Sequence, residues 1–100
     1  MTSKILSIAD WEGFDYYEKS QIDSDAYAHI LEFLLNEGFD ISHPHCQYYE
    51  KKYIEAYTNL FFATNDLVTY LREQEPNMTC WFADFGTKTA EVRYGTNLCN

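Results

Sequence analysis

The sequence predicts a small α+β domain in which an antiparallel sheet packs on two helices, the second of them long. Two observations lead to this fold class. Apolar residues recur at the helical period between residues 23 and 38 and again between 45 and 73, and residues 79–94 resemble two short strands around a glycine turn. A length of 100 residues, 46% of them hydrophobic, indicates one compact domain spanning residues 1–100.

The N-terminal segment is expected to add a strand to that sheet. Ile5, Leu6 and Ile8 suit a short strand. The aromatic residues between Trp11 and Tyr17 favour a second strand, because aromatic side chains pack well on pleated, half-buried surfaces.

The first helix is predicted to begin at Asp23 or Ser24, since either side chain can accept hydrogen bonds from the free amides of a helix start. Gly38 is predicted to end this helix in a left-handed conformation, with Phe39 making the hydrophobic contact that accompanies such an end. The apolar positions between these signals are Ala26, Ile30, Leu31, Leu34 and Leu35.

The second helix is predicted to begin at Pro44, because the first helical position does not need an amide hydrogen, and to end before Pro76. Two adjacent apolar stripes run along it and predict a broad buried face at the centre of the core. One stripe comprises Tyr53, Ala56, Leu60, Ala63, Leu67 and Tyr70, and the other comprises Ile54, Tyr57, Phe61, Thr64, Val68 and Leu71.

Phe62 is predicted on the opposite, polar side of this helix, in line with Glu55 and Thr69 at about 100° per residue. An aromatic ring in that position either packs on another part of the fold or anchors a partner protein. Both interpretations are kept.

Residues 79–85 and 89–94 are predicted to form a hairpin around Gly86. In the second strand Ala90, Val92 and Tyr94 alternate with polar residues, which predicts one covered and one wet face. The tripeptide that begins at Asp84 spells a kinase metal-binding motif, but the chain lacks the other kinase motifs, so a turn is expected there.

The acidic residues are concentrated near the N-terminus. The chain carries 16 Asp and Glu against 7 Lys and Arg, a net charge of −9, and nine of those acids lie with two lysines in the first forty residues. Carboxylates on a rigid surface attract basic partners, and neighbouring aromatic rings offer area that an interface can bury. The alternative is that the acids only keep the domain soluble. The residues expected to bind a partner are Asp10, Trp11, Glu12, Asp15, Tyr16, Glu18, Asp23, Asp25 and Phe62.

These features predict a non-enzymatic protein that docks on a basic, nucleic-acid-binding partner protein and inhibits it. In size, acidity and aromatic content the chain resembles the small phage-encoded or mobile-element inhibitors of restriction and CRISPR systems. That resemblance implies occupation of a nucleic-acid channel by mimicry of DNA phosphates, or obstruction of a conformational change. The alternatives are an immunity or antitoxin-like protein that neutralises a basic toxin, and a homodimer joined through the long helix. Neither direct nucleic-acid binding nor membrane binding is expected.

The densest group of metal-ligating side chains is His43, His45 and Cys46, and imidazole with thiolate suits zinc. A small zinc-supported structural module is therefore a further alternative. The favoured interpretation is a polar helix start in which the histidines cap the helix or lie in solvent, so no metal or other cofactor is expected. Cys46 next to His45 is sequence adjacency only and predicts no catalytic pair.

The cysteines and the N-terminus predict a cytoplasmic protein. Three cysteines, Cys46, Cys80 and Cys99, make an odd number without a closely spaced pair, which favours reduced thiols. The first residues lack the apolar stretch of a secretory signal.

Overall fold

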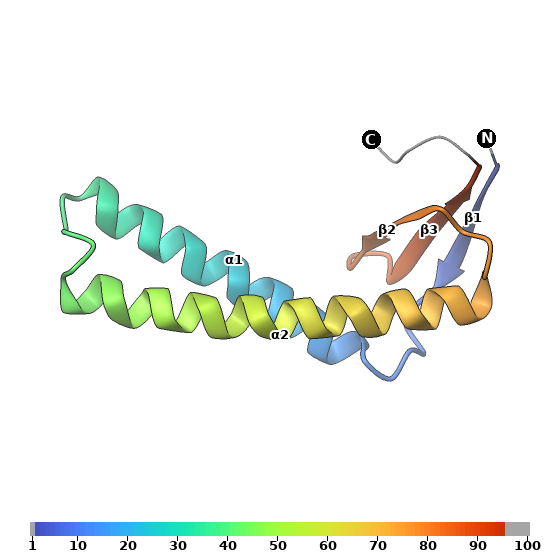
Figure 1. Cartoon of the computed structure of the whole chain (residues 1–100), viewed down its shortest axis with the longest axis horizontal. Coiled ribbons are helices and arrows are strands. Elements are labelled where there is room, and N and C mark those ends of the chain that lie inside the picture. Colours follow the sequence, from blue (N-terminus) through green and yellow to red (C-terminus); the bar gives the residue numbers. More distant parts are fainter. Residues whose placement is uncertain (1, 96–100) are drawn as a thin grey trace. The chain divides into compact units, whose positions relative to one another are not determined.

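The structure, a computed structural model, describes residues 2–95 and confirms the α+β fold. The elements follow in the order β1 (Thr2–Ser7), α1 (Phe14–Asn36), α2 (Pro44–Gln74), β2 (Cys80–Asp84) and β3 (Thr89–Tyr94) (Figure 1). Internal contacts divide the chain into two compact units. The sheet unit comprises Met1–Phe14 and Asn65–Asn100, and the hairpin unit comprises Asp15–Thr64. Each is described by itself, and the single domain expected from the length stays a prediction.

The sheet unit contains three antiparallel strands in the order β1-β3-β2, beside the last turns of α2 (Figure 1). The N-terminal strand pairs with β3 in a register that sets Leu6 opposite Ala90. Ala90 and Val92 are fully buried, as the alternation in the second strand predicts, and so are Leu67 and Leu71 of α2. These apolar side chains form the core of the unit.

The chain leaves β1 through consecutive tight turns and not through a second strand, so that expectation is wrong. The amide of Trp11 donates to the carbonyl of Ile8, and the amide of Phe14 donates to the carbonyl of Trp11, both at 3.1 Å. Helix α1 begins at Phe14, nine residues before Asp23. Phe14 and Tyr17 lie three positions apart and are both buried, so their burial on one helical face outweighs the weak strand preference of aromatic residues.

The remaining helix boundaries agree with the sequence signals. At the end of α1, Gly38 has φ +93°, its amide donates to the carbonyl of Leu35, and the amide of Phe39 donates to the carbonyl of Leu34. This is the hydrogen-bond pattern of a Schellman motif. Helix α2 begins at Pro44 and ends two residues before Pro76. The hairpin turn is also confirmed, since the Asp84 carboxylate accepts the amide hydrogen of Gly86 at 2.8 Å.

In the hairpin unit, α1 and α2 run in opposite directions (Figure 1), and Tyr27 of α1 lies near Tyr49 of α2, with 6.2 Å between ring centres. The buried positions of this unit are Tyr17, Ser20, Ser24, Cys46, Ala56 and Ala63. Burial raises the pKa of the Tyr17 phenol, and its hydrogen bond with Thr64 partly offsets that effect. A core made mostly of serine and alanine provides few apolar contacts per residue, so this unit has limited stability of its own.

The broad buried face predicted for α2 is wrong in the hairpin unit. The stripe through Ala56 and Ala63 is buried, but Ile54, Tyr57 and Phe61 of the second stripe are 54%, 55% and 58% exposed. Two packed helices cover one face of each other, and the second stripe lies beyond the covered face.

The expectation of reduced thiols holds for one described cysteine and is wrong for the other. Cys46 is free and buried, whereas Cys80 is disulfide-bonded. An odd number of cysteines guarantees one unpaired thiol and does not prevent a bridge elsewhere. Cys99 lies outside the described residues.

Glu75, just after α2, bonds to two strands of the sheet, the edge strand β1 and the central strand β3. Its carboxylate accepts a hydrogen bond from Lys4 of β1 at 2.7 Å and another from the Tyr94 phenol of β3. The bond from Lys4 lowers the pKa of Glu75, and the bond to Glu75 raises the pKa of Tyr94 to about 12. The Tyr94 contribution to stability is therefore complete below the ordinary tyrosine pKa of 10.0 and is lost as the pH rises through about 12.

We expect Glu75→Gln to lower the pKa of Tyr94 toward 10.0, because the variant removes the negative charge that holds the phenolic proton. The measurement is an NMR titration of the tyrosine ring carbons, with Tyr94→Phe assigning the signal. Glu73→Gln, an exposed neighbour, is the control and should leave that pKa unchanged. An unaltered Tyr94 titration in Glu75→Gln contradicts the contact.

Candidate functional site

One face of α1 carries carboxylates in a row. Glu18, Asp25 and Glu32 are spaced by seven residues, and seven positions advance about 700° around a helix, about 20° short of two full turns. At a rise of about 1.5 Å per residue, successive members lie about 10.5 Å apart along the axis. The row is therefore nearly straight and extends over about four turns.

Among the residues that the structure describes, no cation forms an ion pair with the carboxylates of this row. Within residues 2–95, the ion pairs are Lys4–Glu75, Lys52–Glu55 and Arg93–Glu91, and none of them involves α1. The amide of Gln21 donates to both oxygens of Asp25 at 3.2 Å, which orients that carboxylate without changing its charge. The hairpin unit has nine carboxylates against three lysines, a net charge of −6, so the row lies in a strongly negative surface.

Two large apolar side chains lie beside the row. Ile22 and Phe33 are 58% and 61% exposed, while Ser20 and Ser24 of the same helix are buried. Folding alone favours the reverse arrangement, because burying a serine contributes little and exposing isoleucine and phenylalanine loses the transfer free energy of both. We call the surface formed by Glu18, Ile22, Asp25, Glu32 and Phe33 the α1 outer face.

The residues that the sequence analysis predicted to bind a partner do not all lie on one surface. Glu18 and Asp25 lie in the row. Asp15 is exposed in the first turn of α1, where its charge also complements the positive end of the helix. Asp23 lies on the opposite side of α1, in a polar crevice that Tyr27 and Lys52 also line. Only part of the predicted acidic set therefore shares one face.

The aromatic members of the selected set differ in exposure. Tyr16 and Phe62 are 47% and 56% exposed, so both are available to a partner. Trp11 is buried in the sheet unit, with its ring centre 6.0 Å from that of Tyr70, so it offers no exposed anchor. Asp10 and Glu12 on either side of Trp11 are exposed in that unit. Trp11 lies in the core because burial of its large apolar ring stabilises the sheet unit.

Sequence reasoning missed Ile22, Glu32 and Phe33. These residues share a face with Glu18 and Asp25 only in a helix that begins at Phe14, because Glu18 and Ile22 precede the predicted start at Asp23. The seven-residue spacing was the signal that could have revealed the row.

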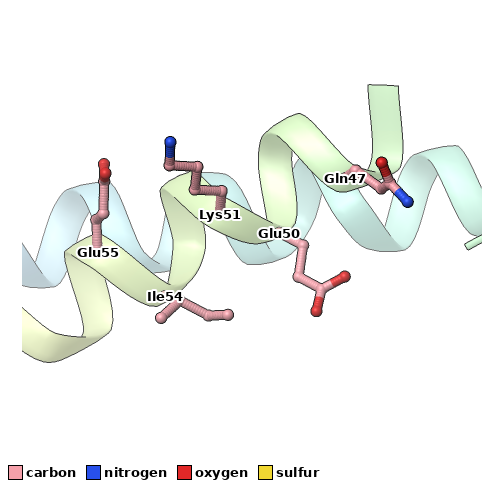
Figure 2. Close-up of a pocket in the computed structure, with 5 residues that line it drawn as sticks. All are labelled: Gln47, Glu50, Lys51, Ile54 and Glu55. Carbon is pink, nitrogen blue, oxygen red and sulfur yellow. The ribbon is translucent and has the colours of Figure 1, made fainter. Parts of the chain in front are cut away.

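A hollow on α2 is lined by Gln47, Glu50, Lys51, Ile54 and Glu55 (Figure 2). All five residues belong to consecutive turns of one helix. In Figure 2 the side chains of Lys51 and Glu55 extend to one side of the ribbon, and those of Glu50 and Ile54 extend to the other. Such a hollow has no opposing wall, whereas small-molecule sites enclose most of their ligand. It therefore does not resemble a substrate site.

His43 caps the start of α2. The ring nitrogen Nδ1 of His43 accepts the amide hydrogen of His45 at 3.1 Å, at the start of α2, as the capping interpretation predicts. The His43 ring also lies edge-on against Phe39, with 4.9 Å between ring centres. In the part of the chain that the structure describes, no three side chains from His, Cys, Asp and Glu converge on a point where they could hold a metal ion.

Comparisons of the chain with protein-family models, with curated proteins and with solved structures give no match. Across residues 2–95, no helix is both long enough and apolar enough to cross a membrane.

Proposed function

We propose that this is a non-enzymatic binding protein whose α1 outer face docks on a basic surface of a nucleic-acid-binding protein and inhibits it. The observation that carries the proposal is the unneutralised row of Glu18, Asp25 and Glu32 beside exposed Ile22 and Phe33. A row of carboxylates kept for solubility alone does not require exposed apolar side chains along its edge.

The carboxylates of the row lie far enough apart to attract cations without strongly repelling one another. Charges in water interact weakly beyond the screening length of about 8 Å at physiological ionic strength, and the carboxylates lie farther apart than that. Each can therefore attract a separate cation while the three repel one another little. When a partner excludes water, the effective dielectric constant falls and each pair strengthens.

The apolar residues supply the contact that charge alone does not. Rim charges mainly increase the association rate, and buried side chains at the centre of an interface slow dissociation. Ile22 and Phe33 lie eleven residues apart, so they bracket about 16 Å of the helix and could seat in two separate depressions of a partner.

The carboxylates of the row also favour a nucleic-acid-binding protein as the partner. Surfaces that bind nucleic acids present arrays of Lys and Arg to phosphates, and a folded row of carboxylates competes for the same cations. A basic toxin would offer similar cations, and the identity and activity of the captured protein distinguish it from a nucleic-acid-binding partner.

We expect the triple reversal Glu18→Lys, Asp25→Lys, Glu32→Lys to abolish capture of basic proteins from a lysate by the immobilised full chain. The matched control is the reversal of Glu37, Asp66 and Glu73, which are exposed carboxylates outside the α1 outer face and change the net charge equally. Capture by the unaltered chain should fall at least about tenfold between about 50 mM and 500 mM salt. Circular dichroism checks that both variants fold.

The captured protein then provides the functional test. The unaltered chain should displace a labelled DNA duplex or RNA from it, and the triple reversal should not. Equal capture by both triple variants, or a captured protein that binds no nucleic acid, contradicts the proposal.

A further inference from the structure

The second exposed feature of the hairpin unit is an apolar stripe on α2. Ile54, Tyr57, Thr58 and Phe61 occupy positions i, i+3, i+4 and i+7, so they share one face of the helix. All four are exposed, and the three large side chains among them are each more than half exposed. We call this set the α2 neutral stripe.

The stripe contains no charged residue, although the surrounding unit carries a net charge of −6. The charged positions that flank the stripe are Glu50 and Lys51, one turn before Ile54, and Glu55, which lines the same hollow as Ile54. Depletion of charge at the centre of an apolar patch is the compositional mark of a protein interface. A solvated helix face of an acidic protein has no reason to exclude carboxylates from two successive turns.

Next to the stripe lies a hollow of about 190 Å³ lined by Tyr57, Leu60, Phe61 and Thr64. These residues also stand at i, i+3, i+4 and i+7, which is the arrangement that forms a hole for a side chain of a facing helix in coiled-coil packing. The hydroxyl of Thr64 donates to the carbonyl of Leu60 at 2.7 Å, so it does not present an unpaired donor to the hole. The hollow therefore suits an apolar side chain.

We infer that the α2 neutral stripe is the interface of a homodimer in which α2 of one copy packs antiparallel on α2 of a second copy. A two-fold axis between Tyr57 and Thr58 sets Ile54 of one copy opposite Phe61 of the other, so each Ile54 enters the hollow of the opposite helix. The charge distribution selects this occupant. Two units of net charge −6 repel each other least when the side chains that meet carry no carboxylate, and a strongly basic partner would be matched by acids that the four stripe residues lack.

The available area predicts a weak dimer. Ile54, Tyr57 and Phe61 each offer roughly 100 Å² or more of exposed surface. In two copies these three side chains together offer roughly 600–750 Å², and the flanking polar residues add to that, so the interface is smaller than the standard size of stable complexes. We expect dissociation in the micromolar range.

The test is sedimentation equilibrium of the full chain from roughly 1 to 200 µM, a range that brackets the expected dissociation constant. The unaltered chain should change from monomer to dimer mass with concentration. Phe61→Glu and Ile54→Lys should each stay monomeric. Tyr48→Glu is the control, because Tyr48 is 55% exposed on another side of α2, and it should dimerise normally. Circular dichroism checks folding, and Ile54→Lys decides the result if Phe61→Glu fails to fold.

Salt separates this inference from the proposed function. Dimerisation through a neutral stripe should persist or strengthen at about 500 mM salt, since salt screens the repulsion between acidic units, whereas partner capture should weaken. The triple reversal on α1 should leave the dimer intact. A monomer mass throughout the concentration range, or equal loss of dimer in Phe61→Glu and Tyr48→Glu, overturns the inference.

Discussion

Trp11→Ala should lower the free energy of unfolding by about 3–5 kcal/mol, whereas Phe62→Ala should change it by less than about 0.5 kcal/mol. Both aromatic residues were expected to bind a partner, but Trp11 is 9% exposed and Phe62 is 56% exposed. Removing the indole leaves a cavity beside Tyr70, and a small domain has only about 5–15 kcal/mol of stability in total.

Urea unfolding followed by circular dichroism measures both values. The Phe62→Ala variant is the matched control, since it removes an aromatic ring from the surface of the same chain. A cost below about 1 kcal/mol for Trp11→Ala would mean that its ring does not contribute to the core. The close approach of the indole to Gly13 supports the larger value, because a Cβ atom on Gly13 would lie 2.6 Å from the Trp11 ring.

The second large effect concerns Leu71, which is fully buried in the sheet unit. Leu71→Ala should cost about 2–5 kcal/mol. Hydrogen exchange should show that slow amides of β3 and of α1 lose protection by the same free energy. The reason is that α2 runs continuously through both units, and a helical hairpin with a core made mostly of serine and alanine is too weak to persist when the sheet unit opens.

Thr69→Ala, at an exposed position two residues earlier, is the control and should leave the protection of both units almost unchanged. Loss of protection confined to the sheet unit in Leu71→Ala would show that the units unfold independently, against the single domain expected from the length.

Elements whose signals act over a few residues could be predicted from the sequence. Gly38 ends α1 because its positive φ suits a residue without a side chain, and Pro44 begins α2 because the first helical position needs no amide hydrogen. The turn at Asp84 depends on a hydrogen bond two residues along the chain. Each of these outcomes follows from chemistry that the local sequence contains in full.

The start of α1 could not be predicted in that way. Phe14 and Tyr17 are compatible with a strand or a helix, and local preference between the two is small. Tertiary burial of both rings on one face decided the helix. The error carried over to the candidate site, because the phase of a helix determines which acids align, and a start at Asp23 left Glu18 and Ile22 off the helix.

The sequence by itself therefore determined the fold class, most element boundaries and the excess of negative charge. Only the tertiary structure decided which carboxylates share a face, that Trp11 belongs to the core and that Ile54, Tyr57 and Phe61 remain exposed. The physical reason is that composition and local hydrogen bonding act within a few residues, whereas burial depends on which face of each helix another element covers. Two adjacent stripes on α2 are both apolar in sequence, and over the hairpin unit one covering helix can bury only one of them.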